Sequence, residues 1–228
     1  MSATDGGEMN DGAVRHSWRC NAAGWIAAVR EGRIESRRLV TDAAMLEAAR
    51  ALAPRRALDI GCGEGWLCRA LAERGVSMLG VDAEPALIEA ARAAGAAEYR
   101  VCTHAELAAA GLGRFDLLLC NFALFQQDLL PTLRTWRDLL EPGGALLIQT
   151  LHPHACGLPQ ADGWRLERFE AFAAGFPANM PWYFRTLESW QALLVGAGWR
   201  IVGLREPLHP LSGKPASLLL QACPDPGS

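Results

Sequence analysis

Leu58-Asp59-Ile60-Gly61-Cys62-Gly63-Glu64-Gly65 is the stretch that decides the fold of this 228-residue chain. A short apolar run at 57–60 lies between Pro54 and the first glycine, and this pattern predicts a buried β-strand. Glycines at 61, 63 and 65 permit a tight turn and let a ligand approach the backbone closely. The helix expected next would begin with free amide groups facing the same space. The stretch therefore predicts a strand that ends in a ligand-binding loop.

Strands and helices alternate downstream of this loop. Five strands are expected at 57–60, 76–81, 99–102, 115–120 and 145–151, with helices at about 66–74, 85–94, 105–110 and 129–140 between them. This alternation predicts a parallel, doubly wound sheet. Thr186 is a plausible N-cap for a last helix, and strands at 199–204 and 217–223 follow it. The link between those two strands is too short for a helical crossover, so we expect them to pair antiparallel.

The chain is expected to form one α/β domain, since 228 residues suit a single core with a modest insertion. Residues 1–13 are expected to be flexible, and helical spacing predicts two helices within 14–53. The ligand-binding core spans 54–151. Residues 152–185 break the alternation and are rich in proline, glycine and aromatic side chains, which indicates a cap or lid insertion. The final helix and hairpin occupy 186–228.

Composition excludes several function classes. The formal charge is −3, so the chain lacks the basic field that attracts nucleic acid. Its seven cysteines include no Cys-x-x-Cys pair and no zinc-ligand spacing, which indicates free thiols and no metal site. The first residues resemble no signal peptide, and no apolar run is long enough to span a membrane. We therefore expect a cytoplasmic protein with no nucleic acid and no membrane as partner.

Asp82 lies at the end of the second expected strand, 21 residues after Gly61. A carboxylate there can accept hydrogen bonds from both ribose hydroxyls of an adenosine-containing cofactor. Dinucleotide sites use G-x-G-x-x-G, whereas this loop reads G-x-G-x-G. The structural alternative is that Asp82 caps a helix and the glycines serve only as a turn. The combination favours an adenosine cofactor other than a dinucleotide.

Four segments together carry a resemblance to a known family. The run at 57–65 resembles the first motif of class I S-adenosylmethionine-dependent methyltransferases, close to the ubiquinone/menaquinone-biosynthesis type. Gly80-Val81-Asp82-Ala83-Glu84-Pro85 is similar to the second motif, and the runs at 115–121 and 139–146 resemble the fourth-strand motif and the turn into the fifth strand. The resemblance covers about residues 55–151. It implies a Rossmann-like sheet of seven strands and methyl transfer from S-adenosylmethionine, with S-adenosylhomocysteine as product.

The resemblance also implies a set of cofactor-binding residues. Asp59 would reach the amino group of the cofactor directly or through water, Asp82 would bind the ribose, and Ala83 would flank the adenine. Many relatives have an acidic residue after the third strand, where this chain has Thr103 and His104, which are its candidate replacements. The positions expected around the methionyl part and beside the acceptor are Gly61, Cys62, Gly63, Gly65, Asn121 and Phe122.

We expect the residues that contact the methyl acceptor at the end of the fifth strand and in the flanking segments. His152 and His154 follow that strand and are the candidate bases, with capping or solvated roles as the alternative. Aromatic faces favour a cation such as the sulfonium, and guanidinium groups bind carboxylates bidentately. Candidate lid and substrate residues on these grounds are Trp18, Trp25, Arg37, Arg38, Trp182, Tyr183 and Arg185, each with ordinary packing or solvation as the alternative.

The leading hypothesis is methyl transfer to an O, N or S atom of a small molecule, mainly by proximity and orientation. A non-catalytic S-adenosylmethionine-binding partner protein is the alternative from another class. An NAD(P)-dependent oxidoreductase is disfavoured by the glycine spacing and by the antiparallel hairpin. We expect a monomer or a homodimer.

Overall fold

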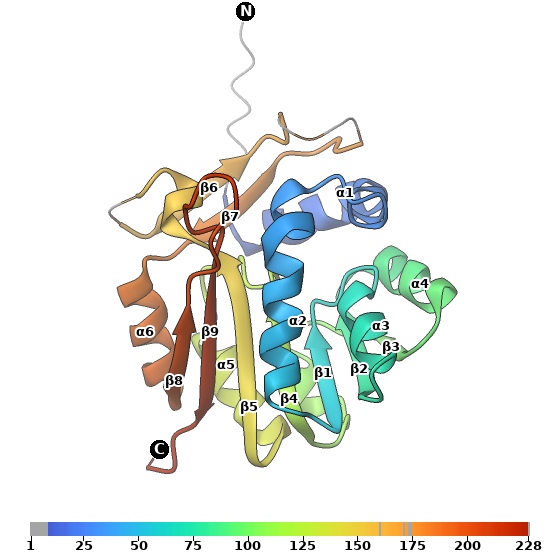
Figure 1. Cartoon of the computed structure of the whole chain (residues 1–228), viewed down its shortest axis with the longest axis vertical. Helices are drawn as coiled ribbons and strands as arrows, with labels where there is room; N and C mark the ends of the chain where they lie inside the picture. Colours follow the sequence, from blue (N-terminus) through green and yellow to red (C-terminus); the bar gives the residue numbers. More distant parts are fainter. Residues whose placement is uncertain (1–8, 160, 171, 173–174, 228) are drawn as a thin grey trace, which may run out of the picture.

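A seven-stranded sheet forms the centre of the computed structural model, which describes residues 9–159, 161–170, 172 and 175–227 (Figure 1). The strand order is β3-β2-β1-β4-β5-β9-β8. Strands β1 to β5 are mutually parallel, whereas β9 pairs antiparallel with both β5 and β8. The bounds are β1 Arg56–Ile60, β2 Ser77–Asp82, β3 Glu98–Val101, β4 Phe115–Asn121, β5 Leu140–Leu151, β8 Trp199–Arg205 and β9 Ser217–Pro224. The predicted doubly wound sheet and antiparallel terminal hairpin are confirmed.

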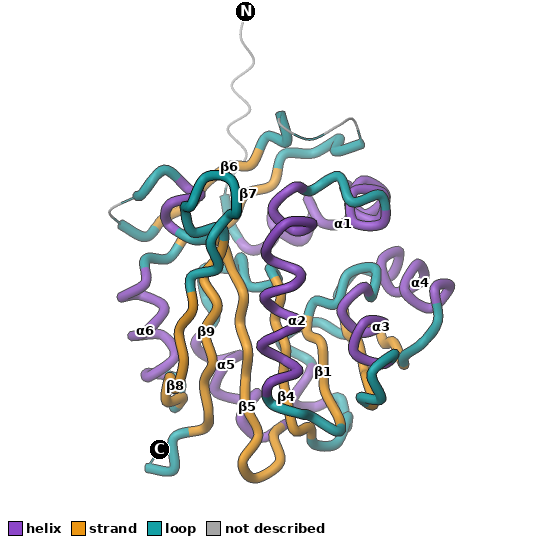
Figure 2. Tube along the Cα trace, viewed as in Figure 1, coloured by secondary structure: helices purple, strands orange, loops and turns teal. Residues whose placement is uncertain are grey.

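Helices cover both faces of the sheet (Figure 2). One face packs against α2 (Asp42–Ala51), α3 (Trp66–Ala72) and α4 (Pro85–Ala94). The other face packs against α5 (Leu130–Trp136) and α6 (Leu187–Gly196). Alternate residues of β1 enter the two cores, so that Leu58 and Ile60 face the α5 and α6 side. Asp59 therefore points to the α2 and α3 side, where it is buried with a relative exposure of 2%.

Two predicted helices are shorter than expected. The helix expected at 105–110 is a single 3-10 turn, η2 (Leu107–Ala109), because Gly111 follows with a positive φ of 61°. The helix expected at 129–140 ends as α5 at Trp136 and continues only as the 3-10 turn η3 (Arg137–Leu139). Leu140 already pairs with Phe115, so β5 begins five residues before the expected start at 145.

Two segments distant in the sequence meet above the carboxyl ends of the parallel strands (Figure 1). One is helix α1 (Asp11–Arg30), which begins after the N-cap Asn10. The other is the antiparallel hairpin of β6 (Gly163–Glu167) and β7 (Met180–Phe184), preceded by the 3-10 turn η4 (Pro153–Cys156). We call α1 and the hairpin segment 163–184 the roof.

The start of the chain differs in part from the expectation. Residues 11–13 belong to α1 and are not part of a flexible stretch, while residues 1–8 lie outside the described residues. Thr186 caps α6 as predicted, since its hydroxyl accepts the backbone N–H of Ser189 at 3.2 Å. Within the described part of the chain, no helix is both long enough and apolar enough to cross a membrane.

Candidate active site

The glycine loop between β1 and α3 requires backbone conformations that suit glycine. Gly61, Gly63 and Gly65 have φ values of 75°, 56° and 84°. A Cβ atom at Gly61 would lie 2.4 Å from the Cβ of Ala123, and one at Gly65 would lie 2.6 Å from the hydroxyl of Tyr99. The loop is therefore fixed in shape by its neighbours, which keeps its backbone close to the space above the sheet.

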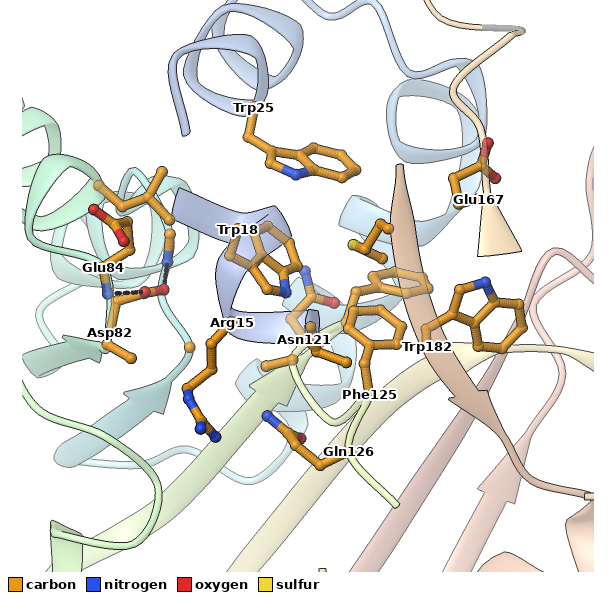
Figure 3. Close-up of a pocket in the computed structure, with 18 of the residues that line it drawn as sticks. Arg15, Trp18, Trp25, Asp82, Glu84, Asn121, Phe125, Gln126, Glu167 and Trp182 are labelled. Atoms are coloured by element: carbon orange, nitrogen blue, oxygen red, sulfur yellow. Dashed lines mark hydrogen bonds between the residues drawn. The ribbon is translucent and has the colours of Figure 1, made fainter. Parts of the chain in front are cut away.

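Asp82 links this loop to the start of α4. Its Oδ2 atom accepts the backbone N–H of Gly63, and its Oδ1 atom accepts that of Glu84, both at 2.9 Å. Burial raises the pKa of the Asp82 carboxyl group above its ordinary value. Each oxygen retains further lone-pair capacity for a ligand. Asp82 thus fixes the shape of the site and also presents its carboxylate to the cavity (Figure 3).

A cavity of about 1040 Å³ lies above the loop and beneath the roof (Figure 3). Its wall combines the glycine loop, the ends of β2 and β4, the segment after β3, α1 and the hairpin. Of the residues expected from sequence, the wall contains Gly61, Cys62, Gly63, Asp82, Ala83, Thr103, His104, Asn121, Phe122, Trp18, Trp25, Arg37 and Trp182. The structure therefore brings together residues that lie far apart in the sequence.

Two buried side-chain atoms near the glycine loop have no hydrogen-bond partner among the described residues, one on Arg37 in the cavity wall and one on Asp59 behind the loop. Arg37 belongs to the π-helical turn η1 (Arg37–Thr41), a conformation frequent at functional sites. Its Nε atom donates to Asp42 Oδ1 at 2.9 Å and its guanidinium lies over Trp66, yet its Nη2 atom has no partner among the described residues. Asp59 Oδ2 accepts the Cys68 thiol at 3.5 Å, whereas Asp59 Oδ1 has no such partner. The site therefore holds one spare cationic donor and one spare carboxyl oxygen.

Burial also shifts the pKa values of Asp59 and His104. It raises the pKa of Asp59 to about 7, a rise that the Cys68 thiol and the Arg37 guanidinium partly offset. Burial lowers the pKa of His104 to about 4, so its imidazole is neutral at pH 7. The His104 ring meets the Trp136 ring edge-on at 5.5 Å. Thr103 is already occupied, because its hydroxyl donates to Glu106 at 2.8 Å.

The two candidate bases do not reach the cavity wall. His152 is buried, with Nε2 2.7 Å from Glu206 Oε1 and with Nδ1 accepting the backbone N–H of His154. His154 is exposed and stacks on His152 at 5.3 Å. Both nitrogens of His152 are thus engaged in capping η4 and in binding Glu206. The expectation that the two rings point toward the acceptor fails because the His152 ring is held by Glu206 and by the His154 N–H, while Ala155 and Cys156 are the residues of η4 that line the cavity.

Five further expected residues also lie off the cavity wall. Asp59 and Gly65 are behind the loop, where Gly65 packs on Tyr99. Arg185 is buried and donates from Nη2 to the carbonyl oxygens of Gln126 and Gln127, which ties the hairpin to the segment after β4. The remaining two are Arg38, which is exposed, and Tyr183, whose ring lies under the Arg185 guanidinium.

Several residues of the wall were missed from the sequence. Arg15, Glu84, Gln126 and Glu167 lie around the cavity, with Arg15 on α1 and Glu167 at the end of β6 (Figure 3). Of these four residues, only Glu84 could have been predicted from the sequence, because it lies two residues after Asp82 in the second motif. The other three lie outside the motifs: the position of the roof brings Arg15 and Glu167 to the site, and the segment after β4 brings Gln126.

A family model described as a methyltransferase domain matches residues 33–204. The chain belongs to this methyltransferase family. Its motif residues Gly61 and Asp82, together with the strand order, agree with the resemblance drawn from sequence, which is thereby confirmed.

Curated relatives match part of this methyltransferase. The ubiquinone biosynthesis O-methyltransferase of Xanthomonas campestris pv. campestris is 38% identical over 108 residues, which is 45% of each chain. The enzyme of the same name from Cereibacter sphaeroides is 40% identical over 104 residues, covering 42% of this chain and 41% of the relative. The matched segment thus spans less than half the length of these relatives.

Solved structures share the fold over most of the chain. An S-adenosylmethionine-dependent methyltransferase from Mesorhizobium loti is 26% identical with a TM-score of 0.59, covering 77% of this chain and 95% of that one. The complex described as DhpI-SAM-HEP has a TM-score of 0.68 at 18% identity and covers 96% and 99% of the two chains. The second likeness extends the shared fold to nearly the whole methyltransferase chain.

Proposed function

We propose that this chain is an S-adenosylmethionine-dependent methyltransferase, of class EC 2.1.1.-, that acts on an O, N or S atom of a small molecule. The observation that carries the proposal is the pair of unpartnered buried atoms, Arg37 Nη2 and Asp59 Oδ1, beside the glycine loop and Asp82. The methionyl end of the cofactor is a zwitterion. Arg37, in the cavity wall, offers a guanidinium group for its carboxylate, while Asp59, behind the loop, would reach its ammonium group through water. A buried polar atom without a partner costs free energy, so a ligand that supplies both partners is favoured.

The remaining cofactor contacts follow from the wall of the cavity. Asp82 would accept hydrogen bonds from the ribose hydroxyls, while Ala83 and the neutral His104 border the space for the adenine. Gly61, Cys62 and Gly63 leave room for the methionyl chain. The loop would be obstructed by a side chain at Gly61, which agrees with a backbone that approaches its ligand closely. The residues present therefore fit the cofactor.

When bound, the cofactor supplies a methyl group already activated on a sulfonium. What remains for the protein is to align the acceptor and to exclude water. Asn121 and Phe122 close the end of β4, and Phe122 has a positive φ of 53°, a conformation rare for a residue other than glycine. Trp18, Trp25 and Trp182 form apolar walls on the acceptor side. Catalysis by proximity and orientation is what these residues support.

Charge and composition bear on the partners and the cellular setting. We propose a small-molecule substrate, no nucleic acid partner, and action in the cytoplasm as a monomer or homodimer. The net charge of −3 supports the exclusion of nucleic acid.

Calorimetry with S-adenosylhomocysteine and with NAD tests the cofactor assignment. Binding of the first with no heat from the second is expected, because the loop lacks the G-x-G-x-x-G spacing. Binding of NAD alone would replace the proposal with an oxidoreductase. Release of S-adenosylhomocysteine from S-adenosylmethionine, measured across a panel of phenols, amines and thiols, tests turnover. Binding without release on any acceptor would favour a non-catalytic partner protein.

A further inference from the structure

The roof is held in place by contacts between its two segments. Asn21 of α1 donates from Nδ2 to the carbonyl oxygen of Ala178 at 2.7 Å, and its Oδ1 atom accepts the Ala178 N–H at 3.1 Å. A Cβ atom at Gly24 would lie 2.2 Å from the carbonyl oxygen of Gly175, so the two backbones are in close contact there. The side chains beneath the roof therefore have defined positions in the free protein.

Aromatic rings line the underside of the roof. Trp18 stacks on Trp25 at 5.1 Å and on Phe125 at 6.3 Å, and Phe125 meets Trp182 edge-on at 6.3 Å. All four side chains line the cavity, together with Met180. We call this part of the cavity the aromatic chamber. Its flat apolar walls suit a flat and largely apolar molecule.

Trp25 is fixed in orientation by its neighbours. Its ring makes edge contacts with Phe169, Phe172 and Phe176 at centroid distances of 5.6, 5.9 and 5.0 Å. With Trp18 stacked on it as well, the indole cannot rotate to place its nitrogen in solvent without breaking these contacts. Figure 3 shows the indole nitrogen on the edge of the ring nearer to Trp18.

The Trp25 indole N–H is buried and has no hydrogen-bond partner among the described residues. Other tryptophans of the fold do have partners: Trp136 donates to the His104 carbonyl, Trp199 to the Leu133 carbonyl, and Trp164 to Gln127. Leaving a donor unsatisfied in such surroundings costs free energy, and buried tryptophan N–H groups normally find a partner. An unsatisfied donor held rigidly in the wall of a chamber indicates that a ligand supplies the acceptor atom.

We propose that Trp25 is a recognition residue for the methyl acceptor, and that its N–H donates a hydrogen bond to a carbonyl or ether oxygen of a flat, largely apolar molecule in the aromatic chamber. This inference rests on the proposed function. It narrows the substrate to oxygen-bearing ring compounds, and it assigns the selection among them to a residue distant from the glycine loop. The role is binding and orientation, and the residue takes no part in proton transfer.

The test compares two ring probes of similar shape, coumarin and naphthalene, of which only coumarin carries oxygen. Their affinities are measured by ligand-observed NMR titration with the protein saturated in S-adenosylhomocysteine. The ratio of coumarin to naphthalene affinity in wild type is the reference. Trp25→Phe removes the donor together with part of the ring surface, so the change in naphthalene affinity measures the lost packing, and loss of one hydrogen bond should lower the affinity ratio about fivefold.

Trp164→Phe is the matched control, because it also removes an indole N–H from the roof but lies off the cavity wall. It should leave both probe affinities unchanged.

Three results would overturn the inference while leaving the proposed function in place. They are binding of neither probe by wild type, an unchanged ratio of coumarin to naphthalene affinity in Trp25→Phe, and a loss of S-adenosylhomocysteine affinity in that variant equal to the loss for coumarin. The last would assign the N–H to the cofactor. Failure of wild type to bind S-adenosylhomocysteine would instead refute the proposed function.

Discussion

Replacing Asp82 by alanine tests the cofactor site most directly. The carboxylate ends β2, lines the cavity and already accepts two backbone N–H groups, from Gly63 and from Glu84. If it also accepts hydrogen bonds from both ribose hydroxyls, the substitution removes two charge-assisted bonds to the cofactor. It also loosens the loop on one side of the site and the start of α4 on the other.

The magnitude follows from the number of bonds. A hydrogen bond to a charged group contributes about 1.5 kcal/mol or more, so two of them contribute about 3 kcal/mol. Since about 1.4 kcal/mol corresponds to a tenfold change in affinity, Asp82→Ala should weaken S-adenosylhomocysteine roughly 100-fold. Isothermal titration calorimetry on the folded variant measures this change.

Loss of the two backbone hydrogen bonds is a separate effect and needs its own control. Asp116 provides one, because its Oδ2 atom accepts the backbone N–H groups of Arg55 and Arg56 at 2.8 and 2.9 Å. It lies at the amino end of β4, at the opposite edge of the sheet from the cavity. Asp116→Ala should therefore lower the free energy of unfolding without changing S-adenosylhomocysteine affinity.

The reasoning is refuted if Asp82→Ala remains folded and binds S-adenosylhomocysteine within threefold of wild type. Equal losses of affinity in Asp82→Ala and Asp116→Ala would refute it as well. That result would mean that Asp82 acts only through loop stability, as the helix-capping alternative states.

Other parts of the site give further predictions. Gly61→Ala should destabilise the fold by about 1–3 kcal/mol more than Gly75→Ala in urea unfolding, because both glycines have positive φ but only Gly61 has a Cβ clash; equal losses would contradict the close approach. Arg37→Met should weaken S-adenosylhomocysteine about tenfold and spare adenosine, which lacks the carboxylate, while Arg38→Met changes neither. The pKa of Asp59 in the folded chain, about 7, exceeds that of an ordinary carboxyl group, so the native state binds the proton more tightly than the unfolded state. The free energy of unfolding should therefore fall as pH rises from about 4 through 7, and Asp59→Asn should flatten that dependence; an unchanged slope would exclude Asp59 as its source.

The central sheet could be predicted from the sequence because its signals are local. Most of the parallel strands hold a short apolar run that ends at glycine or a polar residue, although β3 carries Glu98 and Arg100. The link after β8 is too short for a crossover helix. Element ends were less predictable. The pairing of Leu140 with Phe115 extends β5 into a Pro-Gly-Gly stretch that alone predicts only a turn. That extension depends on the neighbouring strand, which local spacing does not encode.

The part of the site that we propose to bind the cofactor could also be predicted, because its sequence signals are local as well. Gly61, Asp82 and Ala83 lie at strand ends, and the carboxyl ends of parallel strands meet at one edge of the sheet. His152 also follows a strand end, yet it turns away to bind Glu206, a residue 54 positions later in the chain. A strand end thus places the backbone of a residue near the site but leaves the side-chain direction to tertiary contacts.

The part of the site that we propose to bind the methyl acceptor depends on tertiary contacts. Trp25 and Phe169 are 144 positions apart in sequence, and contacts such as the pairing of Asn21 with Ala178 bring their segments together. Helical spacing placed Trp25 on a helix but could not show what covers it. The structure shows that its N–H is buried beside a cavity with no partner among the described residues, and this is a property of two segments together. Selection of the acceptor should therefore change when the roof changes, while cofactor affinity, set by the strand ends, should stay constant.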